Sequence, residues 1–277
     1  MDVDLLAGGR CGADAGPGTP LMSRLARSAR RVGSYAMFYV GLFLFGLFCL
    51  LWSLPAGVLY RIMPRPQGAR CGQFAIMAGF RLYIAVMERL GIFRCDLRAL
   101  DALRDAGPLV IAPNHPSLLD AVLVVSRLPR VVCITKASIW DNPFLGGGAR
   151  LAGYIRNDAP LNLIKRAIDE LCDGHQLLVF PEGTRTSQPP VDSFKGGFLL
   201  MARKAGAPVQ TVFIESSSGY LGKGWPLFRK PELPLVLRAR LGERFDVPPD
   251  THGFMTNLEH YYHDQLTPDP PALRRSG

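Results

Sequence analysis

Two short polar motifs, each at the end of an apolar run, hold the residues of this chain best suited to chemistry. In the first, IAPNHPSLLD at residues 111–120, His115 and Asp120 lie five residues apart. A carboxylate bonded to one imidazole nitrogen fixes the tautomer and leaves the other nitrogen free to act as a base. The spacing therefore fits a His–Asp pair for general-base catalysis. The alternative is a capping Asn114, a structural histidine and a surface aspartate.

The second motif is LLVFPEGTRT at residues 177–186, where an apolar run leads directly into Pro-Glu-Gly-Thr-Arg. Gly183 permits close backbone approach, and the planar guanidinium of Arg185 suits a phosphate. Taken alone, this motif is explained equally well by a strand, a turn and a structural Glu182–Arg185 pair.

Together, an H-x-x-x-x-D box and an F-P-E-G-T-R box some 60 residues later resemble the motifs of the glycerolipid acyltransferase family. The resemblance covers roughly residues 75–245. It implies that His115 is the general base and that Asp120 orients it. The substrate-binding residues that it implies are Asn114, Lys136, Glu182, Gly183, Thr184 and Arg185.

The resemblance also implies the reaction. An acyl group would pass from acyl-CoA or acyl-carrier protein to the free hydroxyl of a lysophospholipid, above all 1-acyl-sn-glycerol 3-phosphate. No further cofactor is expected. No metal site is expected either, because the remaining histidines lack a carboxylate or cysteine pattern that would complete one.

Two departures from the family pattern concern the acceptor. Gly153 and Tyr154 match the family's second block, but the block continues Arg156-Asn157-Asp158, so its basic residue is displaced. Thr211 stands where a second proline of the fourth block is usual. Another acceptor, such as a lyso-ornithine lipid, therefore stays open. A hydrolase and a catalytically silent lipid-binding protein are further alternatives.

The elements that must position the motifs follow from hydropathy. From about Asp96, short β-rich runs alternate with helical ones, which predicts an α/β domain. Pro116 is expected to open the helix after the first motif. The expected strands are 109–112, 131–135, 176–180, 209–214 and 233–241. The expected helices are 97–106, 117–128, 161–172, 194–205 and 254–266.

An apolar N-terminal stretch predicts a membrane anchor. Residues 32–60 contain no charged side chain, and the roughly 20 of them before Pro55 would span about 30 Å as a helix, one hydrocarbon thickness. Residues 71–93 are apolar but contain two arginines and one glutamate, which favours an amphipathic interfacial helix. Basic residues on both flanks of the first stretch also fit a helical hairpin that enters one leaflet.

Composition limits the partners and the compartment. The chain has 277 residues, 48% hydrophobic and 20% charged, with a net charge of +9, which excludes a disordered chain and a fibre. The charge favours anionic lipid or a phosphorylated substrate, and no nucleic-acid-binding motif is present. The six cysteines lie at least 22 residues apart, which indicates free thiols in a reducing compartment. We expect a cytoplasmic (inner) membrane protein whose active site faces the cytoplasm.

Four segments are therefore expected. A disordered or basic segment covers residues 1–31, and a membrane-associated helical motif covers 32–95. The α/β acyltransferase domain covers 96–267, and 268–277 form a flexible tail. Within the domain, residues 222–229 (GKGWPLFR) combine aromatic and basic side chains, so they are expected either at the bilayer surface or in a packed loop.

Overall fold

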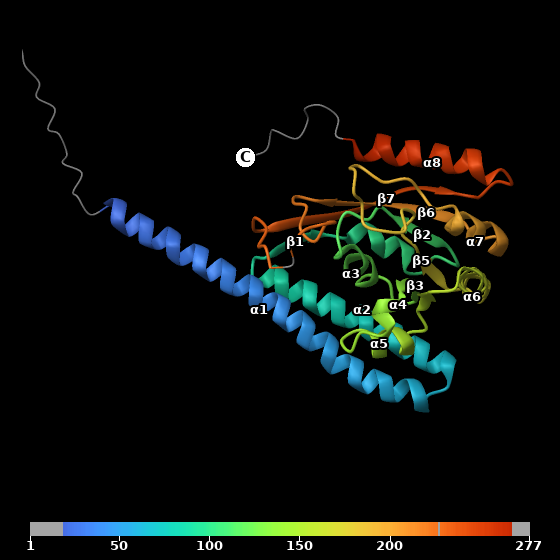
Figure 1. Cartoon of the computed structure of the whole chain (residues 1–277), viewed down its shortest axis with the longest axis horizontal. Coiled ribbons are helices and arrows are strands. Elements are labelled where there is room, and N and C mark those ends of the chain that lie inside the picture. The colour runs from blue at the N-terminus through green and yellow to red at the C-terminus, as the bar shows by residue number, and fades with distance from the viewer. Residues whose placement is uncertain (1–18, 227, 268–277) are drawn as a thin grey trace, which may run out of the picture.

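A seven-stranded sheet carries both motifs (Figure 1). The computed structural model describes residues 19–226 and 228–267, and for residues 19–31 and 34 it describes the backbone only. The strand order is β1-β7-β6-β2-β5-β3-β4, and all neighbours pair parallel except β6 and β7. The strands are β1 (Phe93–Asp96), β2 (Val110–Pro113), β3 (Val131–Lys136), β4 (Ile155–Asn157), β5 (Gln176–Leu178), β6 (Val209–Ser216) and β7 (Leu235–Phe245).

Helices cover both faces of this sheet (Figure 1). Along β2, Ile111 packs into one buried cluster while Val110 and Ala112 pack into the other, as the two-residue period of a strand requires. The first cluster is shared with α1, α2, η1 and α3, and the second with α6, α7 and α8. The short helices are η1 (Arg98–Leu103), α3 (Asp120–Val125), α4 (Ala137–Trp140) and α5 (Gly146–Leu151), and the longer ones are α6 (Pro160–Cys172), α7 (Gly197–Ala205) and α8 (Thr251–Leu266).

Each of the five expected strands overlaps an observed one, whereas β1 and β4 were not expected. These two strands have four and three residues, too few to show a period in the sequence. Because β1 begins at Phe93, the sheet starts before the expected domain start at residue 96.

The expected helix start after the first motif is wrong. Helix α3 begins at Asp120, so Pro116 and Ser117 lie in a loop. The Asp120 carboxylate accepts a hydrogen bond from Ser117 N, and Ser117 Oγ accepts one from Leu119 N. These local bonds hold the backbone in a non-helical path, as short polar side chains often do.

Two long helices, α1 (Thr19–Ile62) and α2 (Arg65–Arg89), precede the sheet (Figure 1). Residues 19–31, expected in the disordered or basic segment, have a helical backbone. Residues 1–18 and the expected tail, 268–277, lie outside the described residues. Within the described part of the chain, Tyr35–Ile62 form one helical segment long and apolar enough to cross a membrane, with a hydropathy of 2.2.

The C-terminal half of helix α1 packs on the domain, whereas its N-terminal part extends away from it (Figure 1). Cys49 and Ala56 are buried on one side, where Ser53 Oγ accepts a hydrogen bond from Gly147 N in α5. On the other side Phe43 and Leu51 are 66% and 61% exposed. Both sides of the helix are therefore apolar, but protein covers only one of them.

Candidate active site

The two motifs meet because of the strand order. Strands β2, β5, β3 and β4 are neighbours in the sheet and all run parallel. His115 follows β2, Glu182 and Arg185 follow β5, and Lys136 ends β3. The carboxyl ends of parallel strands lie at one edge of a sheet, which is where open α/β sheets hold their ligands. Sheet order therefore gathers residues from distant parts of the chain at that edge.

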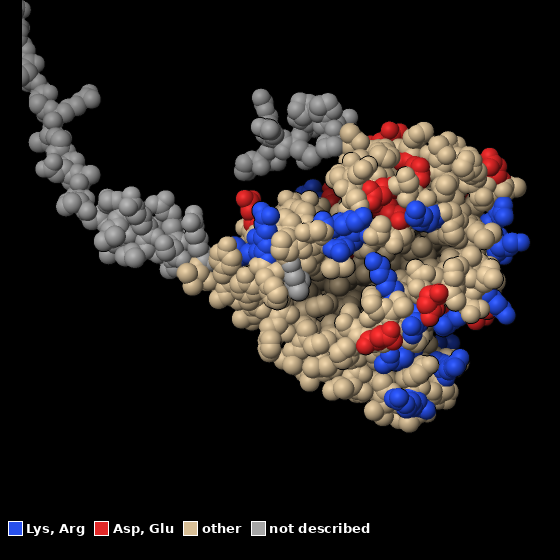
Figure 2. Space-filling model, viewed as in Figure 1, with Lys and Arg blue, Asp and Glu red and all other residues tan. Residues whose placement is uncertain are grey.

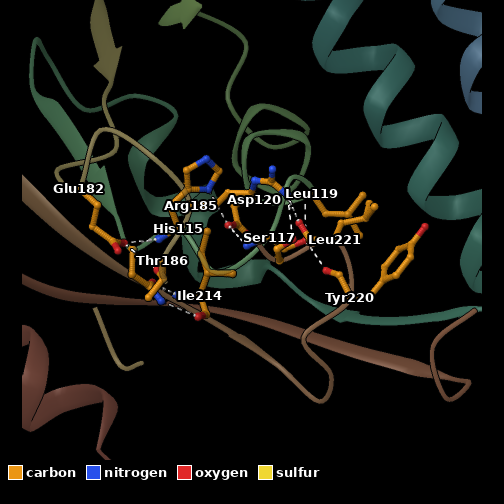
Figure 3. Close-up of polar contacts among 12 residues, drawn as sticks. His115, Ser117, Leu119, Asp120, Glu182, Arg185, Thr186, Ile214, Tyr220 and Leu221 are labelled. Carbon is orange, nitrogen blue, oxygen red and sulfur yellow. Dashed lines mark hydrogen bonds and ion pairs between the residues drawn. The ribbon is translucent and has the colours of Figure 1, made fainter. Parts of the chain in front are cut away.

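His115 and Asp120 form a hydrogen-bonded pair (Figure 3). Imidazole Nδ1 lies 2.9 Å from Asp120 Oδ2, and Ser117 N donates to the same oxygen at 2.7 Å. An ionised carboxylate only accepts, so Nδ1 carries the proton. Nε2 has no hydrogen-bond partner among the described residues. The His115 side chain is 14% exposed and that of Asp120 1%, so the imidazole is partly accessible while its partner stays in the interior.

Burial sets the ionisation of Asp120. Desolvation raises the pKa of this carboxyl to about 6, although its hydrogen bond to His115 acts in the opposite direction. The second oxygen, Oδ1, is buried and has no hydrogen-bond partner among the described residues. Near pH 7 the carboxylate is ionised, but only the His115 imidazole and Ser117 N compensate its lost hydration.

The His115 ring is also fixed from its face. It stacks on Phe180, with 3.8 Å between ring centroids and 17° between planes. Phe180 belongs to the second motif, but no pattern in that motif assigns it to the site. Contact with an aromatic ring holds the imidazole in one orientation, which proton transfer requires.

Glu182 joins the two motifs from the interior (Figure 3). It is 1% exposed, and its Oε1 accepts hydrogen bonds from His115 N at 2.8 Å and from Thr186 Oγ1 at 3.0 Å. Its Oε2 accepts from Asp192 N at 2.9 Å, and Thr186 N donates to His115 O at 2.8 Å. The structure thus gives this carboxylate a positioning role, while its predicted contact with substrate stays a prediction.

The three uncharged residues predicted to bind substrate are Asn114, Gly183 and Thr184, and they differ in burial and in hydrogen bonding. Asn114 is 3% exposed, and its amide is bonded both ways to the backbone of Ile214, at 2.7 and 3.0 Å. Gly183 has a φ of 70°, a conformation that favours glycine, and its N–H donates to Phe180 O. Thr184 lines a cavity of about 550 Å³ beside Glu182.

Two predicted cations remain available to an anion. Arg185 Nη1 donates to the carbonyls of Leu221 and Gly222, at 2.9 and 2.8 Å, and its other N–H groups have no partner among the described residues. Lys136 is exposed and makes no ion pair with a described residue. Lys and Arg side chains flank the hollow at the centre of the face shown in Figure 2.

Arg156, the displaced basic residue of the second block, is already paired. Its Nε lies 2.6 Å from Asp158 Oδ2, and its Nη1 lies 3.6 Å from Asp141 Oδ1. On β4 it stands beside Thr135 of β3, one position from Lys136. Its charge is therefore partly neutralised at the place where the family pattern would have a headgroup contact.

Ser117 is a structural residue of the loop between β2 and α3, residues 114–119, which we call the catalytic loop because it holds the candidate base His115. It is 3% exposed, and its hydroxyl donates to Tyr220 O at 2.9 Å. No hydrogen bond joins it to His115, so the pair required for a serine nucleophile is not formed. Sequence reasoning missed Tyr220 and Leu221 as neighbours of this loop, because no pattern links them to the first motif.

Comparison with known proteins identifies the domain. Residues 94–215 match the family model described as Acyltransferase. The 1-acyl-sn-glycerol-3-phosphate acyltransferase BAT2 of Brassica napus chloroplasts is 27% identical over 138 residues, 48% of this chain and 40% of that protein. The lyso-ornithine lipid O-acyltransferase of Pseudomonas aeruginosa is 33% identical over 111 residues, 39% of this chain and 43% of that protein. The crystal structure of the 1-acyl-sn-glycerophosphate acyltransferase PlsC from Thermotoga maritima aligns over 87% of this chain and 96% of that chain, with a TM-score of 0.65 and 19% identity.

Residues 94–215 therefore match the acyltransferase family, and the resemblance predicted from the two motifs is confirmed. The expected α/β fold behind an apolar N-terminal helix is confirmed as well. The chain spans only 40% and 43% of the length of the two curated relatives.

Proposed function

We propose that this chain transfers a fatty acyl group from a thioester to the free hydroxyl of a lysophospholipid. The best-supported acceptor is 1-acyl-sn-glycerol 3-phosphate, which would give phosphatidic acid. The observation that carries the proposal is the His115–Asp120 pair, with imidazole Nε2 unpaired at the edge where Arg185 and Lys136 also lie. A base and two cations at one edge suit an acceptor that bears both a hydroxyl and a phosphate.

This geometry supports the following reaction. His115 Nε2 removes the acceptor hydroxyl proton as the oxygen attacks the thioester carbonyl. The tetrahedral intermediate then collapses, the C–S bond breaks, and the imidazolium returns its proton to the leaving thiolate. Asp120 stabilises the imidazolium between these steps. A positioned general base of this kind is worth about 10²–10⁴-fold in rate. No acyl-enzyme is needed, which agrees with the buried and bonded hydroxyl of Ser117.

The intermediate also requires donors for its oxyanion. The N–H of Gly183 is occupied by Phe180 O, whereas the N–H groups of Thr184 and Arg185 have no partner among the described residues. They lie on the loop that Glu182 ties to His115. Backbone N–H groups fixed in this way stabilise developing negative charge without reorganisation.

A second acceptor has its own support. The lyso-ornithine lipid O-acyltransferase of Pseudomonas aeruginosa is more identical to this chain, over a shorter stretch, than the Brassica napus relative. Arg156 is paired with Asp141 and Asp158, which leaves fewer free cations than a phosphate monoester would favour. An ornithine headgroup carries a carboxylate and an amine, and it needs less positive charge.

The membrane and the donor complete the proposal. The partners are membrane lipids, the lysophospholipid, and either acyl-CoA or acyl-carrier protein, and no nucleic acid. The apolar helix supports association with a membrane. We propose that this is the cytoplasmic membrane and that the site faces the cytoplasm. The donor is a substrate, and we propose no cofactor. Among the described residues, no group of three or more His, Cys, Asp or Glu side chains gathers as metal ligands would.

An acceptor panel tests the function. The purified full chain, in detergent, is supplied with labelled palmitoyl-CoA or palmitoyl-carrier protein and with lysophosphatidic acid, lyso-ornithine lipid or lysophosphatidylcholine. Products are identified by mass. We expect phosphatidic acid as the main product and little free fatty acid. Acylated ornithine lipid as the main product would select the second acceptor. Fatty acid release that no acceptor changes would make the protein a thioesterase.

A further inference from the structure

The loop between β6 and β7, described for residues 217–226 and 228–234, packs against the first helix. The Tyr39 hydroxyl of α1 donates to Phe228 O at 2.8 Å. Tyr220 packs edge to face on Phe38, with 5.5 Å between ring centroids. Both contacts join residues about 180 positions apart in the chain. The β6–β7 loop is therefore attached to the apolar helix and not only to the sheet.

The same loop holds the catalytic loop. Its Tyr220 carbonyl accepts from Ser117 Oγ, and its Leu221 carbonyl accepts from Leu118 N at 3.2 Å and from Arg185 at 2.9 Å. Leu221 has a φ of 56°, in the left-handed region that costs energy for a residue with a Cβ atom. The hydrogen bonds on both sides of Leu221 hold the backbone in this conformation. The positions of both motifs therefore depend on the conformation of the β6–β7 loop.

The outer part of the β6–β7 loop presents aromatic and basic side chains to the surroundings. Phe228 is 69% exposed and lies next to Tyr39, which is 38% exposed. Lys230 Nζ stands over the ring of Tyr35, 4.9 Å from its centroid, and Arg229 stands over the ring of the nearby Trp225. Aromatic rings beside cations favour the level of lipid headgroups, and cations are attracted to an anionic leaflet.

We propose that the β6–β7 loop is a bilayer-contact element. In this proposal Phe228 enters the headgroup layer of an anionic membrane, and Arg229 and Lys230 contact lipid phosphates. The partner is a lipid surface because Phe228 continues the exposed apolar side of α1, which includes Phe43 and Leu51. The net charge of +9 complements an anionic surface. Docking would hold the carbonyls that bind Ser117, Leu118 and Arg185, and so position the catalytic loop at the membrane.

A photocrosslinking experiment tests contact without any reference to activity. Photoreactive benzoylphenylalanine replaces Phe228 in the full chain, which is bound to vesicles of phosphatidylcholine and phosphatidylglycerol and irradiated. The same substitution at Leu51 is the positive control. Leu161 is the negative control position, because it is 85% exposed on α6, which packs in the buried cluster on the other face of the sheet from α1. We expect lipid adducts at 228 and 51 and none at 161. Adducts at 51 but not at 228, or at neither, would overturn the proposal, as would equal adducts at 228 and 161.

An activity experiment, which rests on the proposed function, tests the link to catalysis. Phe228→Ser should lower kcat/KM about tenfold for acceptor embedded in anionic vesicles. Turnover of a short-chain, water-soluble acceptor and donor should stay within twofold, because the catalytic pair is untouched. Leu161→Ser is the matched control and should leave both reactions within twofold. Equal losses on vesicle-embedded and soluble substrates would mean that Phe228 has only a structural role, and would contradict the link between membrane contact and catalysis.

The two experiments separate the two ideas. If the unmodified chain acylates no acceptor, the proposed function fails, while lipid adducts at 228 would still establish the membrane contact. If it acylates soluble and embedded acceptors but 228 gives no adduct, the function stands and the bilayer-contact element is withdrawn.

Discussion

Helix α1 is attached to the domain by close backbone contact, whereas the catalytic loop is held by directed hydrogen bonds. A Cβ added to Gly147 of α5 would meet Ser53 O of α1 at 2.0 Å, and one added to Gly72 of α2 would meet Ala152 N at 2.6 Å. At the catalytic loop the distances that matter join donors to acceptors. There Asp120 and Glu182 between them accept five hydrogen bonds.

The difference predicts two kinds of sensitivity. Close-packed helices cannot accept added volume, because neighbouring backbone has no room to move. A loop built from hydrogen bonds tolerates changes that keep them, but it loses its geometry when one partner is removed. Substitutions in the loop should therefore reduce turnover more than stability, and substitutions between the helices should do the reverse.

Removing the base is the strongest test of the catalytic loop. His115→Ala should lower kcat by about 10²–10⁴-fold, because Nε2 is the proton acceptor. The melting temperature should stay within a few degrees of wild type, since the ring is partly exposed and its main-chain bonds remain. His252→Ala, at the start of α8, is the control. Turnover of His115→Ala within about tenfold of wild type would contradict the general-base role.

Asp120→Asn should separate activity from stability. The amide supports the wrong tautomer of His115, so kcat should fall on the order of 10³–10⁴-fold. The folded-state pKa of Asp120 is raised to about 6, so the folded chain binds this proton more tightly than the unfolded chain. The free energy of unfolding therefore falls as pH rises from about 4 to 6 and stays lower above that range.

The neutral amide of Asn removes the cost of burying an ionised carboxylate at position 120. We expect Asp120→Asn to be more stable than wild type at pH 7.5, by about 1–3 kcal/mol in urea unfolding, with the difference vanishing near pH 4. Wild-type turnover should fall as pH drops through about 6, where Asp120 takes up its proton. A variant that is less stable at pH 7.5 would contradict the burial argument.

Added volume between the helices should act in the opposite way. Gly147→Ala places a methyl group against the Ser53 backbone and should cost roughly 1–3 kcal/mol of unfolding free energy. Turnover at a temperature where the variant is folded should change little. Gly46→Ala is the matched control, because nothing lies within 4 Å of its added Cβ on α1. Equal melting temperatures for the two variants would remove the proposed contrast.

The smallest expected effect concerns the acceptor. Lys136→Ala removes an exposed cation at the end of β3 and should raise KM for a phosphorylated acceptor about tenfold, with KM for the thioester unchanged. Lys204→Ala, in the last turn of α7, is a control for the loss of one positive charge. If Lys136→Ala instead weakened the thioester and spared the acceptor, the cation would serve the donor.

Much of the candidate site could be predicted because its residues lie close together in two short segments of the sequence. His115 with Asp120, and Glu182 with Arg185, each lie within six residues, and five strands showed an apolar run of sufficient length. The roles of Asn114 and Glu182 could not be predicted in the same way. Each bonds to residues that are distant in the chain, such as Ile214 and Asp192, and no local pattern specifies such partners.

The two motifs, the uncharged stretch of residues 32–60 and the alternation of strands and helices can all be read from residue types alone. These depend on residue type and on periods of two or 3.6 residues, which are local properties. The position of β5 between β2 and β3 is seen only in the tertiary structure. This strand order places Arg185 and Lys136 at the same edge of the sheet as His115. The contact of the β6–β7 loop with both α1 and the catalytic loop is likewise seen only in the tertiary structure. Both results depend on which surfaces bury one another across more than 40 residues of sequence, and that depends on the packing of the whole domain.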